Sequence, residues 1–192
     1  MEAMNLQALR GKVLIEILKE HTETDSGIIL ARSKKEIAHR GKVLSVGLPA
    51  IEKKKESPQV AKMGDIVYFK KYAGKTFWID NKPYLALKRD EILAGSDSRS
   101  IWAVRNTLLV ELKYAEKIGN IYLHEDSKQY EGEFVGNVIS VGEEVSFKEQ
   151  VRSGDKIFFR RHEGFHVYYK FEDFISLREK WVVGKMEAIK HG

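Results

Sequence analysis

The feature that most constrains the fold of this chain is an internal repeat. Four blocks of the first half return in the same order in the second half. The first two return 95 residues later and the last two 90 residues later, because a connecting segment shortens from 16 residues between Gly47 and Gly64 to 11 between Gly142 and Gly154. The paired blocks are 14–16 with 109–111, 41–47 with 136–142, 62–69 with 152–159, and 87–89 with 177–179. We therefore predict a tandem duplication, with a first unit at 1–95 and a second at 96–192.

Each unit is predicted to be all-β. Short runs rich in β-branched and aromatic residues, bounded by Gly, Asp, Asn and Pro, are typical of strands in a small barrel or sandwich. In the first unit they are 13–18, 42–46, 66–69, 76–79 and 84–87, and in the second 107–112, 134–141, 156–160, 165–169 and 171–176. Residues 90–93 are predicted to form either one helical turn or a terminal strand. Residues 94–100 have the composition of a flexible linker.

Composition places the chain among globular proteins without disulfides. Its 192 residues are 43% hydrophobic and 32% charged, and none is Cys. No apolar run reaches the length of a membrane span, and the amino terminus does not resemble a secretory signal. We therefore expect a cytoplasmic protein. A unit of this size buries only about 60–65% of its unfolded surface, so association with other units is expected to stabilise it.

Two short apolar segments stand out from polar surroundings. The triplet Ile28-Ile29-Leu30 follows Gly27 inside the polar stretch 20–40, and Ile121-Tyr122-Leu123 follows Gly119 in the second unit. Such arms cannot bury enough apolar surface to order themselves, so each is predicted to be a mobile loop carrying a hydrophobic hook. The alternative is that both segments are short edge strands in fixed hairpins.

Several motifs of the first unit, taken together, resemble those of the GroES-type co-chaperonins, the lid subunits of chaperonins. They are the opening Met4–Leu9, the hook Gly27–Leu30, and the strands Arg40–Gly47, Lys62–Phe69 and Glu91–Ala94. The second unit has the same skeleton with a looser match. The resemblance implies two tandem GroES-like small β-barrels, each with a long mobile loop. Two units in one chain resemble the double-domain lids of plastids, which leaves a plastid location open, and a phage or bacterial duplication fits equally.

This sequence departs from the family pattern at a few positions. Ala31 stands where many members have Pro, and Tyr122 replaces the central aliphatic residue of the second hook. The shorter connection of the second unit leaves little chain for a roof hairpin. These departures leave open whether the second hook binds as the first does.

The resemblance implies an ATP-dependent cap on a GroEL-type chaperonin ring, which assists protein folding. The chaperonin-binding residues would be Gly27, Ile28, Ile29, Leu30, Ile121, Tyr122 and Leu123. They would enter a groove on the chaperonin large subunit. The chain itself would need no cofactor, since the ATP is bound by the partner.

The resemblance also implies that the terminal strand of one unit packs beside the opening strand of the next. The interface residues would then be Leu6, Leu9, Ile92, Leu93, Ile101 and Val104; the alternative is that they form ordinary intradomain core. A ring-shaped homo-oligomer follows, but two-unit chains fill a seven-fold ring unevenly. Four chains with one idle unit, three chains with a single-domain co-chaperonin, or seven chains using only their first units all remain open.

Other functions find less support in the sequence. No nucleophile–base set and no thiolate ligands are present, so neither an enzyme nor a metal site is expected. His162 and His166 flank a predicted turn rather than one helical face. The alternative function is a nucleic-acid-binding tandem β-barrel, with Lys70-Lys71, Arg160-Arg161 and aromatic residues as a stacking platform. The aromatic residues of that platform are Tyr72, Phe77, Trp78, Tyr168 and Tyr169.

Overall fold

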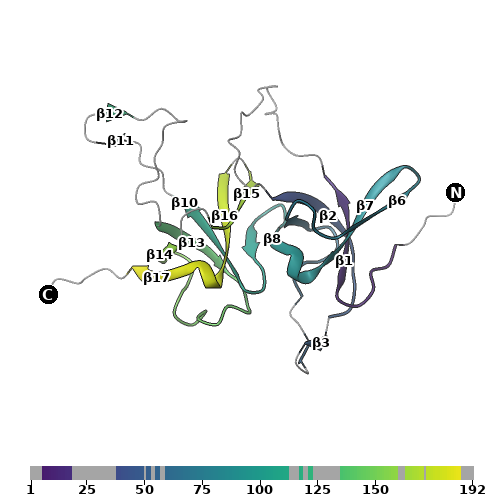
Figure 1. The fold of residues 1–192 in the computed structure, drawn as a ribbon, viewed down its shortest axis with the longest axis horizontal. Helices are drawn as coiled ribbons and strands as arrows, with labels where there is room; N and C mark the ends of the chain where they lie inside the picture. The colour runs from purple at the N-terminus through teal and green to yellow at the C-terminus, as the bar shows by residue number, and fades with distance from the viewer. Residues whose placement is uncertain are drawn as a thin grey trace.

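The computed structural model describes residues 6–18, 38–49, 51–52, 55–56, 59–112, 117–118, 121–122, 135–159, 163–170 and 172–186. These residues form an all-β protein in which two sheets lie at opposite ends of the long axis (Figure 1). The all-β prediction is therefore confirmed. Within the described residues, no helix is long and apolar enough to cross a membrane.

Each predicted strand occurs with bounds within three residues of those expected from the sequence. The first half contains β1 (Lys12–Ile17), β2 (His39–Val46), β3 (Ile51–Glu52), β4 (Lys55–Glu56), β5 (Ile66–Phe69), β6 (Lys75–Ile79), β7 (Lys82–Lys88) and β8 (Ile92–Ser96). The second half contains β9 (Ile101–Ala103), β10 (Thr107–Leu112), β11 (Lys117–Ile118), β12 (Ile121–Tyr122), β13 (Val135–Val141), β14 (Lys156–Phe159), β15 (Phe165–Tyr169), β16 (Glu172–Arg178) and β17 (Val182–Met186). A 3-10 turn precedes each terminal strand, at Arg89–Glu91 and Glu179–Trp181.

The two large sheets share the same order of six strands, and β9 is added at the edge of the first. The first runs β6-β7-β1-β2-β5-β8-β9 and the second β15-β16-β10-β13-β14-β17. Equivalent strands pair with the same register, and the register shifts at equivalent places, between Leu14 and Ile15 in β1 and between Leu109 and Val110 in β10. The duplication in the sequence is thus a duplication of structure.

Identical turn chemistry explains why the two copies fold alike. Gly64 and Gly154 have φ of +94° and +92°, a conformation that favours glycine at the turn before β5 and β14. The carboxylate of Asp65 accepts the Lys62 N–H at 2.7 Å, and that of Asp155 accepts the Arg152 N–H at 2.8 Å. Each turn therefore launches its strand in the same direction.

Each sheet surrounds an apolar core of its own. The largest buried side chains of each core alternate along the strands, as expected for a sheet with one covered face. The first core contains Val13, Ile15, Val43, Val60, Ala61, Val67, Phe69, Leu85, Leu87, Ile92 and Val104, and the second contains Leu108, Val110, Val138, Val145, Val151, Ile157, Phe159, Ile175 and Leu177.

The connection between the units differs from its prediction as a flexible linker. Ala94, Gly95 and Ser96 belong to β8 and are buried, and residues 97–100 close a tight turn. The Asp97 carboxylate accepts the N–H groups of Arg99 and Ser100 at 2.7 and 2.8 Å. The composition prediction is wrong here because strand pairing and this side-chain bond override the local flexibility of Gly and Ser.

The segment after β2 differs between the units, as its length suggested. In the first unit β3 and β4 form a small hairpin. In the second, residues 142–155 form consecutive turns, held by bonds such as Gln150 N–H to Phe147 O at 2.9 Å, with Val145 and Val151 buried in the core.

Candidate functional site

The opening strand of the second unit is part of the first unit's sheet. β9 pairs antiparallel with β8, and the partners are Ala94 with Ala103, Gly95 with Trp102 and Ser96 with Ile101. The Trp102 ring lies so close to Gly95 that a Cβ there would stand 2.5 Å from its Nε1 atom. The second unit therefore supplies the outermost strand of the first.

Val104 of the second unit also contributes to the interior of the first unit. It follows β9, is only 4% exposed, and packs in the core of the first unit with Ile92. Trp102 packs against the same core. The first core is thus completed by residues that belong, by sequence, to the second unit.

A third apolar cluster lies between the two sheets. The first unit contributes residues from β5, β8 and the start of β2, and the second contributes residues from β9, β10 and the β15–β16 hairpin. The buried members are Ala38, Tyr68, Leu93 and Ala94 on one side and Ile101, Ala103, Leu109, Val167 and Phe174 on the other. We call this cluster, with the β8–β9 pairing, the internal joint. Figure 1 shows β15 and β16 on the side of the second sheet that faces β8.

A β-bulge at Leu93 gives the internal joint a specific polar contact. The β5–β8 register shifts so that Tyr68 pairs with Ala94 and Phe69 with Ile92, leaving Leu93 outside the ladder. Its carbonyl oxygen accepts the Ser176 hydroxyl at 2.8 Å and, more weakly, the Thr107 hydroxyl at 3.3 Å. The Ser176 hydroxyl of the second unit therefore satisfies a backbone acceptor of the first, while the Thr107 hydroxyl donates chiefly to the Val104 carbonyl at 2.6 Å.

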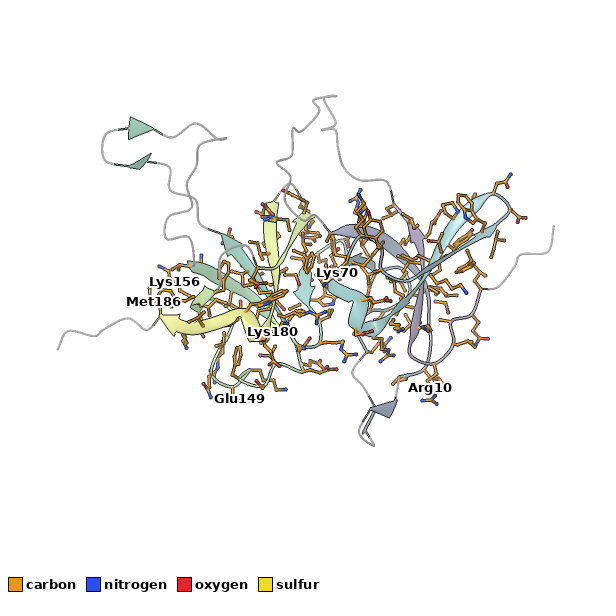
Figure 2. The ribbon with its side chains drawn as sticks, viewed as in Figure 1. Arg10, Lys70, Glu149, Lys156, Lys180 and Met186 are labelled. Carbon is orange, nitrogen blue, oxygen red and sulfur yellow. The ribbon has the colours of Figure 1, made fainter. Side chains whose placement is uncertain are left out.

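Further polar contacts surround the cluster. The Ala38 N–H donates to the carbonyl of His166 at 2.8 Å, and the Tyr169 hydroxyl donates to the carbonyl of Asp97 at 3.1 Å. The Lys70 ammonium lies 4.3 Å from the centre of the Phe165 ring, between the two sheets (Figure 2).

The buried histidine of the joint is oriented by a carboxylate. Nδ1 of His166 lies 2.9 and 3.0 Å from the two carboxylate oxygens of Asp173, on the neighbouring strand β16. This bond fixes the imidazole ring on β15, at the residue whose backbone carbonyl accepts the Ala38 N–H. Among the described residues, no group of three or more His, Cys, Asp or Glu side chains is arranged to hold a metal ion.

The buried Tyr68 phenol is expected to make the internal joint sensitive to alkaline pH. Burial raises the pKa of Tyr68 above its ordinary value, and Tyr169 adds to the effect, while the Ser96 hydroxyl and Arg40 oppose it. Well below about pH 10 the phenol is neutral in both folded and unfolded chains. As the pH rises above this value the unfolded chain ionises first, so the free energy of unfolding is expected to fall until the folded pKa is passed.

Denaturant unfolding between pH 8 and 11 checks this prediction. Tyr68→Phe, which installs the residue found at the equivalent Phe158, is expected to lose less stability over that range than the parent chain. Tyr72→Phe removes the same hydroxyl from a 91% exposed side chain and serves as the control. Equal pH profiles for Tyr68→Phe and the parent would contradict the assignment.

The same two faces occur a second time, uncovered, at the ends of the chain. Val183 in β17 is equivalent to Leu93 and is 71% exposed, against 2% for Leu93. Leu9 is equivalent to Val104 and is 79% exposed, against 4%. The backbone N–H of Ala8 donates to Ser45 Oγ as that of Ala103 donates to Ser140 Oγ, at 2.9 and 3.1 Å, which confirms the equivalence of the opening segments.

We call these two surfaces the head face and the tail face. The head face, on the first unit, comprises Leu6, Ala8, Leu14, Phe77 and Tyr84, the equivalents of Ile101, Ala103, Leu109, Val167 and Phe174. The tail face, on the second unit, comprises Lys156, Phe158, Val183, Gly184 and Met186, the equivalents of Ile66, Tyr68, Leu93, Ala94 and Ser96. Lys156 and Met186 pair across β14 and β17 at the end of the molecule (Figure 2).

The interface residues named from the sequence fall into two groups. Leu93 and Ile101 meet in the internal joint, and Ile92 and Val104 meet in the first core beside it. Leu6 is half-buried and Leu9 exposed at the uncovered head face. The sequence analysis missed the contribution of β15 and β16 to the internal joint. The signal that could have indicated it is that β15 carries apolar residues on both of its faces. Phe165, Val167 and Tyr169 lie on one face, and Tyr168 lies on the other.

Most of the predicted chaperonin-binding residues lie outside the described residues. This holds for Gly27, Ile28, Ile29 and Leu30, and for Leu123. The backbone of Ile121 and Tyr122 forms β12, which pairs with β11 in a separate two-stranded sheet.

Part of the proposed nucleic-acid platform is engaged in other contacts. Lys70 lies over Phe165 in the internal joint, and Phe77 stacks on Tyr84 with ring centres 5.8 Å apart. Tyr72 and Trp78 are exposed. Arg160 and Arg161 lie outside the described residues, as does His162.

Comparisons with known proteins agree with the duplicated architecture. The family model described as the chaperonin 10 kDa subunit matches twice, at residues 5–95 and 100–186. The co-chaperonin GroES of Natranaerobius thermophilus is 38% identical over 93 residues, which are 47% of this chain and 97% of that protein. The co-chaperonin GroES of Aquifex aeolicus is 42% identical over 93 residues, 47% of this chain and 76% of that protein. The chain therefore belongs to the chaperonin 10 kDa subunit family and carries two copies of that family's unit in tandem.

Proposed function

We propose that this protein is a co-chaperonin that caps a GroEL-type chaperonin ring in an ATP-dependent manner and so assists protein folding. The observation that carries the proposal is that both halves match the co-chaperonin family and share one fold, while the surfaces that join them recur uncovered at the chain ends. A protein that only needed a stable pair of β units would have no use for a second, exposed pair of joint surfaces.

The contact with the chaperonin is proposed to be made by the two apolar hooks. Burial of Ile28, Ile29 and Leu30 would contribute roughly 1.5–3 kcal/mol each, whereas ordering the arm costs about 1–2 kcal/mol per residue. One hook is therefore a weak binder. Several hooks on one assembly act together, and such avidity raises affinity by roughly 10²–10⁴. Ile121, Tyr122 and Leu123 are proposed to act in the same way.

The assembly is proposed to form by head-to-tail contact between chains. The head face of one chain would meet the tail face of the next as the two units meet at the internal joint. The tail-face strand β17 and the head-face hairpin β6–β7 lie toward opposite ends of the molecule (Figure 1). Such heterologous contacts close into a ring if the rotation per chain allows it. In such a ring both units of every chain lie side by side, so three chains with a single-domain co-chaperonin, or four chains with one idle unit, would fit a seven-fold partner. Seven chains with only their first units in the ring would require the internal joint to open.

The role we propose is not catalytic. The nucleotide would be bound by the partner chaperonin, and the chain would act by binding and release alone. The relatives reported above come from bacteria, so the proposed compartment is the bacterial cytoplasm rather than a plastid.

Co-elution with a purified bacterial chaperonin ring tests the proposal. The chain is expected to elute with the ring in the presence of ATP and separately in its absence, because capture depends on how the chaperonin presents its binding sites. Binding to single-stranded nucleic acid that weakens steeply with salt, without capture by the chaperonin, would instead support the nucleic-acid alternative.

A further inference from the structure

We infer that the contact between chains is a second and weaker class of joint than the internal joint, with another copy of this chain as its occupant. Assemblies would therefore open between chains, and chains would exchange as intact two-unit blocks. The inference rests on the proposed head-to-tail assembly, and it goes beyond it by ranking the two joints.

The strand pairing of the internal joint can be repeated between chains. In the internal joint Ala94 faces Ala103 and Ser96 faces Ile101. Between chains the equivalent partners are Gly184 with Ala8 and Met186 with Leu6. The first of these pairs consists of small residues and the second of apolar residues, and both kinds of pair fit an antiparallel ladder. A second copy of this chain therefore suits the exposed edge of β17.

The apolar packing behind the strands is also retained. Phe158 replaces Tyr68 on the tail face, and Phe77 and Tyr84 replace Val167 and Phe174 on the head face. All three side chains of the uncovered faces are half-buried in the single chain, so each has surface left to bury. Each face therefore offers aromatic side chains that the other face can cover, as happens in the internal joint. For this reason the occupant we infer is a second copy of this chain.

The polar contacts of the internal joint are not retained. Ser176, whose hydroxyl reaches the Leu93 carbonyl at 2.8 Å, is replaced on the head face by Ala86. The equivalence is fixed by pairing, because Ser176 lies opposite Phe165 and Leu109 as Ala86 lies opposite Lys75 and Leu14. The carbonyl of Val183, at the equivalent bulge of β17, would therefore meet a methyl group.

Two other contacts are lost in the same way. Tyr169, which donates to the Asp97 carbonyl, is replaced by Ile79. The bond between His166 and Asp173 lies within the second unit and orients the residue whose carbonyl accepts the Ala38 N–H; in the first unit Thr76 and Pro83 replace this pair. The contact between chains thus lacks the side-chain bonds that fix the internal joint.

The internal joint and the contact between chains also differ in their charged residues. Lys70 lies over the Phe165 ring in the internal joint, but Lys75 occupies the position of Phe165 on the head face. On the tail face the exposed Lys156 replaces Ile66, which packs against the internal cluster. Both lysines are exposed in the single chain and would lose hydration when the faces are covered, which weakens the contact between chains further.

A chain cut at the turn between the units measures both joints in one sample. A protease site is inserted between Ser98 and Arg99, which lie in the exposed turn, and the uncut insertion variant shows whether the insertion itself is tolerated. Native mass spectrometry over a dilution series then gives the concentration at which whole chains separate and the concentration at which cut halves separate. The halves are expected to stay together to concentrations at least about tenfold lower, the effect of one or two net hydrogen bonds.

The possible outcomes separate this inference from the proposed function. Halves that separate at the same or a higher concentration than whole chains would overturn the inference. If whole chains never associate while the halves stay together, the internal joint is still the stronger one, but the assignment of a second copy to the two faces and the proposed ring both fail.

Two reciprocal substitutions, at equivalent positions of the two units, test the role of the Ser176 hydroxyl. Ala86→Ser places a hydroxyl on the head face and is expected to strengthen association between uncut chains about tenfold. Ser176→Ala is expected to weaken the association of cut halves by a similar factor and to leave the contact between chains unchanged. If both variants behave as the parent does in both measurements, the Ser176 hydroxyl does not account for the difference in strength between the internal joint and the contact between chains.

Discussion

Leu93→Asp is expected to destabilise the protein by about 4 kcal/mol or more, because it removes a fully packed side chain and buries a carboxylate without a partner. Leu93 is 2% exposed and lies among Tyr68, Ala94 and the second unit's Phe174 in the internal joint. A protein of this size typically has 5–15 kcal/mol of stability, so the loss is a large fraction of the total. Denaturant unfolding of the parent and the variant measures it.

The chain contains its own matched control for this substitution. Val183 occupies the equivalent bulge of β17 and is 71% exposed. Val183→Asp is expected to change the stability of the single chain by no more than about 0.5 kcal/mol, since the carboxylate stays in water. The same substitution is expected to abolish association between chains, which native mass spectrometry at high concentration detects. Equal destabilisation by the two substitutions would show that Val183 and Leu93 do not occupy equivalent faces.

The repeat and the alternating strands were readable from the sequence because they depend on local pattern. A buried face in a strand requires apolar residues at every second position, and the turn at Gly64-Asp65 requires a residue that tolerates positive φ. Both requirements act within a few residues. The all-β class follows from this pattern, and its repetition indicates that both halves share one fold, whereas the strand order became known only from the structure.

The internal joint was predicted only at its strand ends, because its other contacts are non-local. Ser176 meets the Leu93 carbonyl only because a bulge in β8 leaves that carbonyl outside the ladder, 83 residues away in the sequence. No property of Ser176 itself indicates this partner. The same reason explains the wrong prediction for 94–100, since Gly95 looks flexible until Trp102 is placed over it.

Ile29→Asp is expected to abolish ATP-dependent capture by the chaperonin while leaving the fold unchanged. The residue is the centre of the first apolar hook, and a carboxylate cannot enter an apolar groove without losing its hydration. The effect is multiplied in an assembly, because every chain carries the substitution and the avidity that makes weak hooks sufficient disappears with it. Co-elution with the chaperonin and ATP measures capture, and circular dichroism measures the fold.

Two comparisons make this result specific to the hooks. Met63→Asp places the same charge on a side chain that is 77% exposed in the turn before β5, and it is expected to leave capture unchanged. Ile121→Asp asks whether the second hook contributes: if it does, capture weakens although the first hook is intact. Retained capture by Ile29→Asp would place the chaperonin contact elsewhere on the chain. A loss with Met63→Asp as well would mean that added negative charge, rather than the lost apolar side chain, prevents binding.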